Sequence, residues 1–144
     1  MSDQIILKDV QPIEEHFNLL YSSLSQRRFN ISHENIPSFD EHVKFVINHP
    51  YRVWLIAEVN KTALGNIYIH NDNSIGVNIN EEHLQHLPII FNMIFKKWKP
   101  LPSIPSVRNK NFFINIPQEN DKLVSVIKNL GAKHIQSSYL LDQT

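Results

Sequence analysis

The sequence predicts a single domain of the α/β (α+β) class, with a mixed, mainly antiparallel central sheet flanked by about four helices. Three consecutive runs rich in β-branched and aromatic residues, at 53–59, 63–70 and 74–79, are joined by links of only three residues. Links of this length are typical of antiparallel hairpins. Apolar residues recur at helical spacing before and after these runs. At 144 residues the chain has the length of one compact domain, and we expect residues 1–144 to form one.

Composition excludes several classes of function. Lys+Arg and Asp+Glu number 14 each, so we expect neither a nucleic-acid partner nor an acidic membrane surface. The sequence contains no Cys, which excludes disulfides, thiolate metal sites and a cysteine nucleophile. The N-terminus resembles no signal peptide, and no apolar run has membrane-spanning length, so the expected location is cytoplasmic.

The N-terminal part predicts a strand and two helices. A short apolar run at 5–7 precedes a helical pattern formed by Ile13, Phe17, Leu20, Tyr21 and Leu24. Ser38 and Glu41 have the Ser-x-x-Glu spacing of a capping box, so a second helix is expected to begin there and to end before Pro50. The expected apolar face of this second helix consists of Phe39, Val43, Val46 and Ile47. In the following run, 53–59, both parities are apolar, which indicates a central strand covered on both faces.

The C-terminal half predicts two further helices and two strands. Pro88 is tolerated only in a first turn, so the third helix is expected to begin near it and residues 80–87 to form a loop. A proline-containing loop, 99–110, leads to a strand at 111–116. Asn120 is a good N-cap for the fourth helix, and Gly131 suits the position after its end. A final strand is expected at 133–141.

The order of these elements, with two sequence stretches, resembles the GNAT acyltransferases. Asn120 followed eleven residues later by Gly131 is similar to the family's late helix motif. Residues 30–54, with the pair Glu41-His42, are similar to GNAT members associated with surface-polysaccharide and amino-sugar modification. The resemblance implies an acyl-CoA-dependent N-acetyltransferase that acts on a small amine, such as an amino-sugar nucleotide, with acetyl-CoA as cofactor. Because GNAT domains often dimerise, it also implies a homodimer.

The chain departs from the family where that family holds the diphosphate of CoA. GNAT enzymes use a glycine-rich loop before the third helix, whose amides point at the anion. Residues 82–89 contain no glycine, and Pro88 has no amide hydrogen, so the loop is degenerate. Ile127 stands where many members carry the tyrosine that protonates the leaving thiolate. The positions that the resemblance assigns to the cofactor are Ile79, Leu84, Gln85, His86, Leu87, Ile89 and Asn120.

Two candidates for catalysis are Glu58 and His42. Glu58 lies near the end of the central strand, where some GNAT enzymes hold a general base, and the alternative is a carboxylate that faces solvent. His42 could deprotonate the acceptor amine, and His33 could contact it. The alternative is that His42 packs on its helix and His33 belongs to a loop.

The candidate substrate-binding residues are His33, Tyr68, His70 and Asn78. Asn66, Tyr68 and His70 share a strand parity, and hairpin pairing would bring Asn78 and Asn80 to the same face. This polar stripe lines a cleft or faces water.

Two further groups suggest ion binding only weakly. His83 and His86 lie three residues apart but lack a third ligand, so no metal is expected. Five basic residues around the proline loop either meet the phosphates of CoA or form a solvated rim: Lys96, Lys97, Lys99, Arg108 and Lys110. Two functions therefore remain open, an acyltransferase and a catalytically degenerate GNAT-like domain that binds a ligand or a protein.

Overall fold

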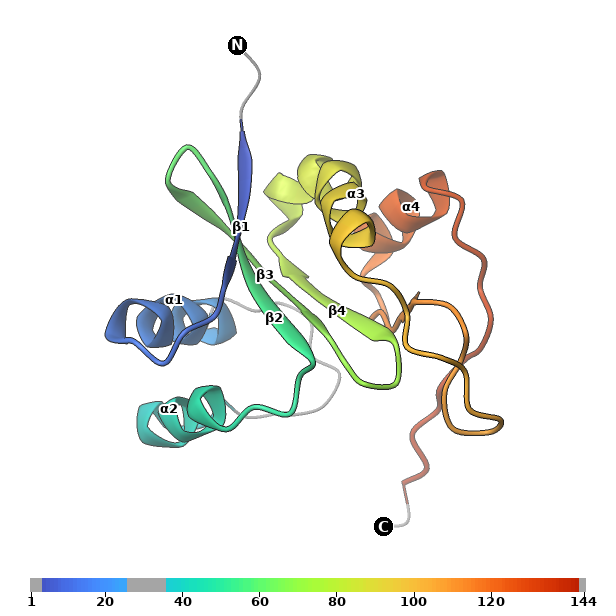
Figure 1. The fold of residues 1–144 in the computed structure, drawn as a ribbon, viewed down its shortest axis with the longest axis horizontal. Helices are drawn as coiled ribbons and strands as arrows, with labels where there is room; N and C mark the ends of the chain where they lie inside the picture. Colours follow the sequence, from blue (N-terminus) through green and yellow to red (C-terminus); the bar gives the residue numbers. More distant parts are fainter. Residues whose placement is uncertain (1–3, 26–35, 143–144) are drawn as a thin grey trace.

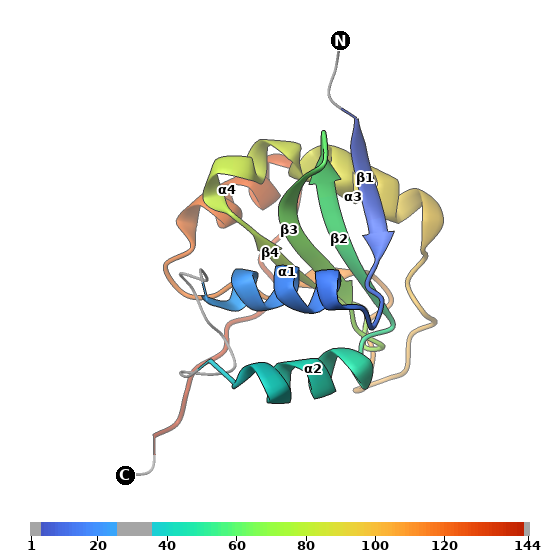
Figure 2. The same cartoon turned by 90° about the vertical axis from the view of Figure 1, so that its left-hand side faces the viewer.

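The computed structural model contains a five-stranded sheet between two helical layers (Figures 1 and 2). The structure describes residues 4–25 and 36–142. The strands follow the order β1-β2-β3-β4-β5, and all neighbours are antiparallel except β4 and β5, which are parallel. The strand bounds are β1 Ile5–Asp9, β2 Val53–Val59, β3 Thr62–Ile69, β4 Ser74–Ile79 and β5 Phe113–Ile114. The predicted mixed, mainly antiparallel sheet with four α-helices is confirmed.

Each face of the sheet has its own apolar core. One face packs against α1 (Glu14–Ser25) and α2 (Phe39–Ile47), and the other against η1 (Glu81–His86), α3 (Leu87–Lys97) and α4 (Asp121–Asn129). Strand β2 contributes to both cores, because Leu55 and Ala57 point to one and Trp54 and Ile56 to the other. The prediction that this strand is covered on both faces is confirmed.

Helix α2 begins as predicted but buries a different face. The Ser38 hydroxyl accepts a hydrogen bond from the Glu41 N–H at 3.2 Å, which confirms the cap. The buried residues are His42 and Val46, whereas Phe39 and Ile47, predicted to face the core, are 40% and 54% exposed. The apolar spacing predicted the wrong face of the helix because histidine was counted as polar. His42 is nevertheless buried, and its Nε2 lies within hydrogen-bond distance of a carbonyl of α1.

The predicted loop at 80–87 is wrong, because most of it forms the 3-10 helix η1. Leu84 and Leu87 are both buried and lie three residues apart, which matches the three-residue turn of a 3-10 helix. This helix runs directly into α3, where Pro88 occupies the first turn as predicted.

Both predicted C-terminal strands differ from the structure. The strand expected at 111–116 is only the two-residue β5, because the chain turns away from β4 after Ile114. The strand expected at 133–141 is absent, since a strand forms only by pairing and this segment pairs with none of the described strands. Helix α4 ends as predicted: Gly131 adopts a φ of +93°, and the N–H of Ala132 donates to the Ile127 carbonyl at 3.2 Å.

Asn73, in the turn between β3 and β4, fixes the proline loop and the start of β5. Its fully buried amide donates to the carbonyls of Leu101 and Asn109 at 2.9 and 2.7 Å, and it accepts from the Leu101 N–H at 2.8 Å. Its backbone carbonyl accepts from the N–H of Phe113 at 3.2 Å. One side chain therefore holds together segments about 30 residues apart in the sequence.

We expect Asn73→Gly to lower the free energy of unfolding by about 2–4 kcal/mol, because three hydrogen bonds of a buried amide are lost. Glycine tolerates the φ of +74° at this position, so backbone strain does not contribute. Urea denaturation would measure the effect, with Asn71→Gly at an exposed position of the same turn as control. A change below about 0.5 kcal/mol for Asn73→Gly would contradict this role.

Candidate functional site: the cleft between β4 and β5

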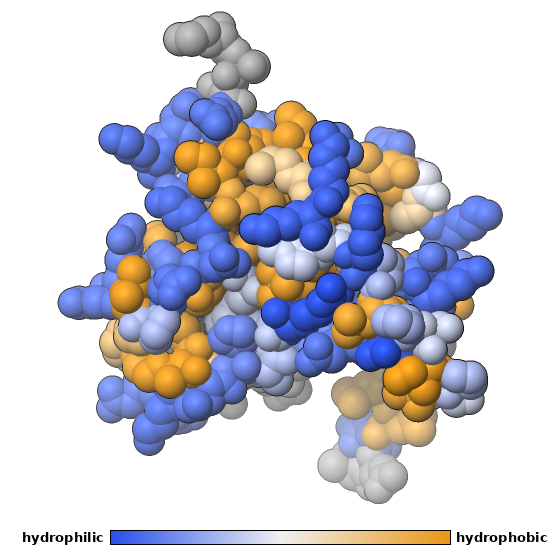
Figure 3. Space-filling view, in the orientation of Figure 1, coloured by the Kyte–Doolittle hydropathy of each residue, from blue (hydrophilic) through white to orange (hydrophobic). Residues whose placement is uncertain are grey.

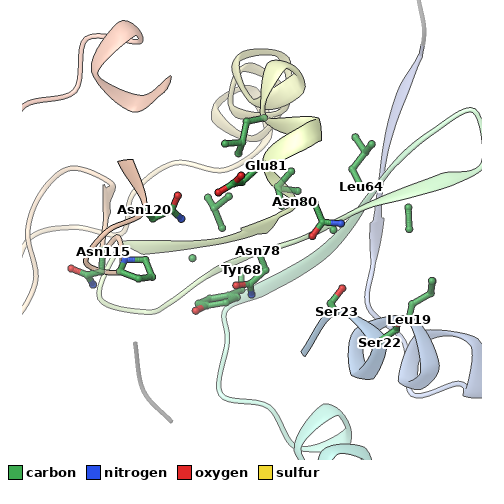
Figure 4. Close-up of a pocket in the computed structure, with 17 residues that line it drawn as sticks. Leu19, Ser22, Ser23, Leu64, Tyr68, Asn78, Asn80, Glu81, Asn115 and Asn120 are labelled. Atoms are coloured by element: carbon green, nitrogen blue, oxygen red, sulfur yellow. The ribbon is translucent and has the colours of Figure 1, made fainter. Parts of the chain in front are cut away.

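Strands β4 and β5 pair at two positions and then separate, which leaves a cleft. The pairs are Ser74 with Phe113 and Ile75 with Ile114. Beyond them, residues 76–79 of β4 and Asn115 line a pocket with a volume of about 260 Å³ (Figure 4). Polar residues at the ends of neighbouring parallel strands are a common place for ligands in open sheets.

The lining of this cleft is polar but almost uncharged. Four asparagines contribute to it, namely Asn78, Asn80, Asn115 and Asn120. Ser22 and Ser23 of α1 and Tyr68 of β3 add hydroxyl groups (Figure 4). Among the described lining residues Glu81 alone is charged, and its carboxylate lies 3.1 Å from the ammonium of Lys122. The site therefore suits a ligand with amides and hydroxyls rather than one with phosphates.

Hydrogen bonds across the sheet orient the asparagines. Asn66 lies directly opposite Asn78, as the predicted hairpin register requires. The buried Asn66 side-chain oxygen accepts from Trp54 Nε1 at 3.1 Å and from Asn78 Nδ2 at 3.2 Å. Trp54 on β2 thus orients the Asn66 amide, and Asn66 in turn holds the Asn78 amide at the cleft.

Tyr68 is held in place by its neighbours on both sides. A Cβ atom at Gly76 would lie only 2.0 Å from the Tyr68 ring, so the strand opposite must carry glycine at this position. The ring of Tyr51 stacks on that of Tyr68 with centroids 4.2 Å apart. Tyr68 therefore presents a rigid aromatic surface and a hydroxyl group to the cleft.

The N-terminus of α3 is not open to an anion. Because η1 precedes it, the N–H of Leu87 donates to the carbonyl of Leu84, and Pro88 has no N–H to offer. The first turn of η1 carries Glu81 and Glu82, whose charges repel phosphate. The degenerate loop thus retains neither the glycines nor a free helix end.

The predicted cofactor residues divide into two groups. Ile79, Leu84 and Asn120 line the cleft. Gln85, His86, Leu87 and Ile89 do not: Leu87 is fully buried in the core, Gln85 and Ile89 are exposed, and His86 is half-buried at the start of α3.

The two catalytic candidates lie outside the cleft. The Glu58 carboxylate is 2.6 Å from the Lys8 ammonium, whose pKa it raises through a hydrogen bond. Buried His42 has its Nε2 3.1 Å from the Phe17 carbonyl, and burial lowers its pKa below 6.5. The structure brings neither side chain to the lining, and their catalytic role remains a prediction.

Of the three substrate-binding candidates that the structure describes, two lie at the cleft. Tyr68 and Asn78 line the cleft, whereas half-buried His70 packs edge-on against Tyr51 and Tyr68 and is not part of the lining. His33 lies outside the described residues.

The ion-binding candidates do not converge on the cleft. Within residues 4–25 and 36–142, no group of three or more His, Cys, Asp or Glu side chains could hold a metal ion. Arg108 donates to the carbonyls of Pro102 and Asn71, and Lys99 to that of Phe95. None of the five basic residues around the proline loop lines the cleft.

No helix in the described part of the chain is long and apolar enough to cross a bilayer.

Sequence reasoning missed Asn115, Ser22, Ser23 and Glu81. Asn115 follows β5 as Asn80 follows β4, so the pairing of these strands would have placed both at one sheet edge. The α1 serines carry no comparable signal, because their position depends on how α1 crosses the sheet.

Comparison with solved structures finds two that share this architecture. A domain from Methanocaldococcus jannaschii DSM 2661 is similar over 95% of this chain and 93% of its own, with a TM-score of 0.67 and 14% sequence identity. A possible acetyltransferase from Clostridium difficile 630 is similar over 97% of both chains, with a TM-score of 0.54 and 10% identity. The sequence matches no protein-family model and no curated protein. At these identities the likeness shows the fold alone.

The burial of His42 predicts that stability depends on pH. Because burial lowers the pKa of His42 below 6.5, the folded state binds fewer protons than the unfolded state as pH falls through this value. We expect the free energy of unfolding to be higher at pH 7.5 than at pH ~5.5, a window above the ordinary pKa of carboxylates. Urea denaturation of wild type and His42→Gln measures the difference.

His49 contributes in the same direction, since burial lowers its pKa as well. The pH dependence should therefore shrink in His42→Gln and shrink further when His49→Asn is added. An unchanged dependence in the double variant would show that other groups control it.

Proposed function

We propose that the protein binds the uncharged arm of an acyl thioester in the cleft between β4 and β5 and transfers the acyl group to a small amine. The observation that carries the proposal is the separation of these strands beside Asn78, Asn80, Asn115 and Asn120. A pantetheine arm has two amides, a hydroxyl and no charge, so asparagine side chains can meet it without counter-ions. The acetyltransferase-like fold supports the choice of reaction.

The acceptor side of the cleft favours a hydroxylated amine. Ser22, Ser23 and Tyr68 provide hydroxyl groups that match the hydroxyls of a sugar. A small amine is cationic near neutral pH, and the carboxylate of Glu81 is the negative charge in the described lining. We therefore propose an amino sugar as the acceptor, and its nucleotide-linked form is a second acceptor to be tested.

The reaction requires few protein groups. The cationic amine first gives one proton to water. Its neutral nitrogen then attacks the thioester carbonyl, a C–N bond forms, the C–S bond breaks, and a second amine proton passes to Glu81 directly or through water. Ile127, at the position of the family's tyrosine, is buried in the core and offers no proton. Tyr68 carries a hydroxyl in the cleft, and we assign to it the proton that the leaving thiolate takes up.

A second candidate is a domain that binds its ligand without turnover. The observation that favours it is the continuation of η1 into α3, which removes the free amides that would hold a diphosphate. Each charge-assisted hydrogen bond that is missing weakens binding by about 1.5–3 kcal/mol.

The donor test compares acetyl-CoA with acetyl-pantetheine by calorimetry. Since the described cleft provides no phosphate cradle, we expect the two dissociation constants to agree within about threefold, a difference below about 0.7 kcal/mol. Asn115→Ala should weaken both about fivefold, the equivalent of one hydrogen bond. Asn111→Ala, an exposed asparagine just before β5, is the matched control and should change neither.

Failure of both ligands to bind at millimolar concentration would refute the proposal. An acetyl-CoA affinity a hundredfold above that of acetyl-pantetheine would show that phosphates are held after all. Thiol release with a panel of amino sugars and their nucleotides then separates the two functions. Turnover that falls tenfold or more in Tyr68→Phe with unchanged donor binding supports transfer, whereas binding without turnover supports the second candidate.

A further inference from the structure

Polar groups of the cleft differ from those of the outer surface in having fixed orientations. Over the face drawn in Figure 3, hydrophilic side chains lie between apolar ones and many extend outward. The amide of Asn78, labelled in Figure 4, lines the cleft and is instead hydrogen-bonded to the buried amide of Asn66. An amide that is held in one orientation presents either its oxygen or its nitrogen to a ligand, and this decides which ligand fits.

Trp54 determines which way the Asn66 amide is turned. An indole N–H can only donate a hydrogen bond, so the atom opposite it must be an acceptor. Trp54 Nε1 lies 3.1 Å from Asn66 Oδ1, and the two residues are only 8% and 4% exposed. Because an unpaired polar group at such a buried place is costly, the Asn66 amide is held with its oxygen toward β2.

The same oxygen then determines the orientation of Asn78. Asn66 Oδ1 has a second lone pair, which accepts from Asn78 Nδ2 at 3.2 Å. The oxygen and nitrogen of a side-chain amide point apart, so Asn78 Oδ1 is turned away from Asn66. Among the described residues no hydrogen bond ends on Asn78 Oδ1, and none of their buried side-chain oxygens lacks a partner. This oxygen is therefore accessible, and the space that its side chain borders is the cleft.

Asn78 belongs to the part of the cleft that faces α1. Side chains alternate along β4, and the neighbours Val77 and Ile79 pack against the core that η1, α3 and α4 cover. Asn78 therefore points to the opposite face of the sheet, where Ser22 and Ser23 of α1 also line the cleft. In the proposed function these serines belong to the acceptor side of the cleft, so Asn78 Oδ1 lies where the acceptor amine would bind.

We propose that Trp54, acting through Asn66, turns Asn78 Oδ1 toward the acceptor and makes the cleft select a cationic amine over a hydroxyl at this position. An ammonium only donates hydrogen bonds, so it matches an oxygen and is repelled by an amide NH₂ group. A hydroxyl donates or accepts, so it fits either orientation. Asn78 is thus the specificity-determining residue and Trp54 a positioning residue. This inference rests on the proposed function, which places an amino sugar in the cleft.

The selection is tested with D-glucosamine and D-glucose, which differ only in an amine or a hydroxyl on one carbon. NMR titrations of the nitrogen-15-labelled protein at pH ~7, where an amine is largely cationic, give both dissociation constants. In Trp54→Phe both amides can turn over, so glucosamine affinity should fall about tenfold, the effect of one lost charge-assisted hydrogen bond. Glucose affinity should stay within about twofold. Trp98→Phe is the matched control and should change neither constant, because Trp98 packs against the other core and does not line the cleft.

Asn66→Asp separates the orientation of Asn78 from the packing of the Trp54 ring. A carboxylate only accepts hydrogen bonds, so Asn78 must donate to it whether or not the indole is present. We therefore expect Trp54→Phe to cost about tenfold in glucosamine affinity when residue 66 is Asn, and less than about twofold when it is Asp. The Asn66→Asp single variant accounts for any attraction by the added charge. An equal loss in both backgrounds, with unchanged circular dichroism spectra, would overturn the proposal.

A measurement on the wild type decides the matter even where a variant does not fold. Trp54 Nε1 and Asn78 Nδ2 donate to one oxygen, so their protons lie close together and should give a nuclear Overhauser cross-peak. Absence of this cross-peak refutes the inference alone, as does a glucosamine affinity that Trp54→Phe leaves unchanged. Failure of both sugars to bind although the cross-peak is present instead refutes the amino-sugar acceptor of the proposed function, and the inference fails with it.

Discussion

The two-residue pairing between β4 and β5 determines where the candidate cleft lies. The pairing begins where the Asn73 carbonyl accepts the N–H of Phe113, while the Asn73 side chain fixes the proline loop beside it. It ends after Ile114, and the separation that follows forms the cleft. Cross-strand bonds through Asn66 and the stacking of Tyr51 on Tyr68 then fix the polar groups that face this space. Tyr68 and Asn78 therefore lie on paired strands, and Asn80 and Asn115 directly follow the ends of β4 and β5.

The charge of the cleft distinguishes it from a site that depends on phosphate. In an anion site, glycine amides and a helix N-terminus provide positive potential. Here η1 occupies that position and carries two glutamates in its first turn. The asparagines lining the described cleft can both donate and accept hydrogen bonds, so they select for polar groups without requiring a charge. The uncharged arm of an acyl thioester offers such polar groups.

Features set by local chemistry could be predicted from the sequence, and features set by distant contacts could not. The three-strand meander, the caps at Ser38 and Asn120 and the first-turn position of Pro88 each depend on a few adjacent residues. By contrast, the burial of His42 depends on a carbonyl of α1, and the ion pair of Glu58 depends on β1. The strand at 133–141 was expected from its pattern, but a pattern cannot supply the partner that a strand needs. Of the cleft lining, five residues were predicted, namely Tyr68, Asn78, Ile79, Leu84 and Asn120, whereas Ser22 and Ser23 depend on how α1 crosses the sheet.

The central claim is that the cleft between β4 and β5 holds an uncharged thioester arm while the start of α3 holds no phosphate. The most direct measurement is an NMR titration of the nitrogen-15-labelled protein with acetyl-pantetheine and then with acetyl-CoA. Both ligands should shift the backbone amides of residues 76–80 and of the non-proline residues of 115–120, while the amides of the non-proline residues of 85–91 stay unchanged with either. Large shifts at 85–91 that appear only with acetyl-CoA would contradict this claim, as would unchanged amides along the cleft.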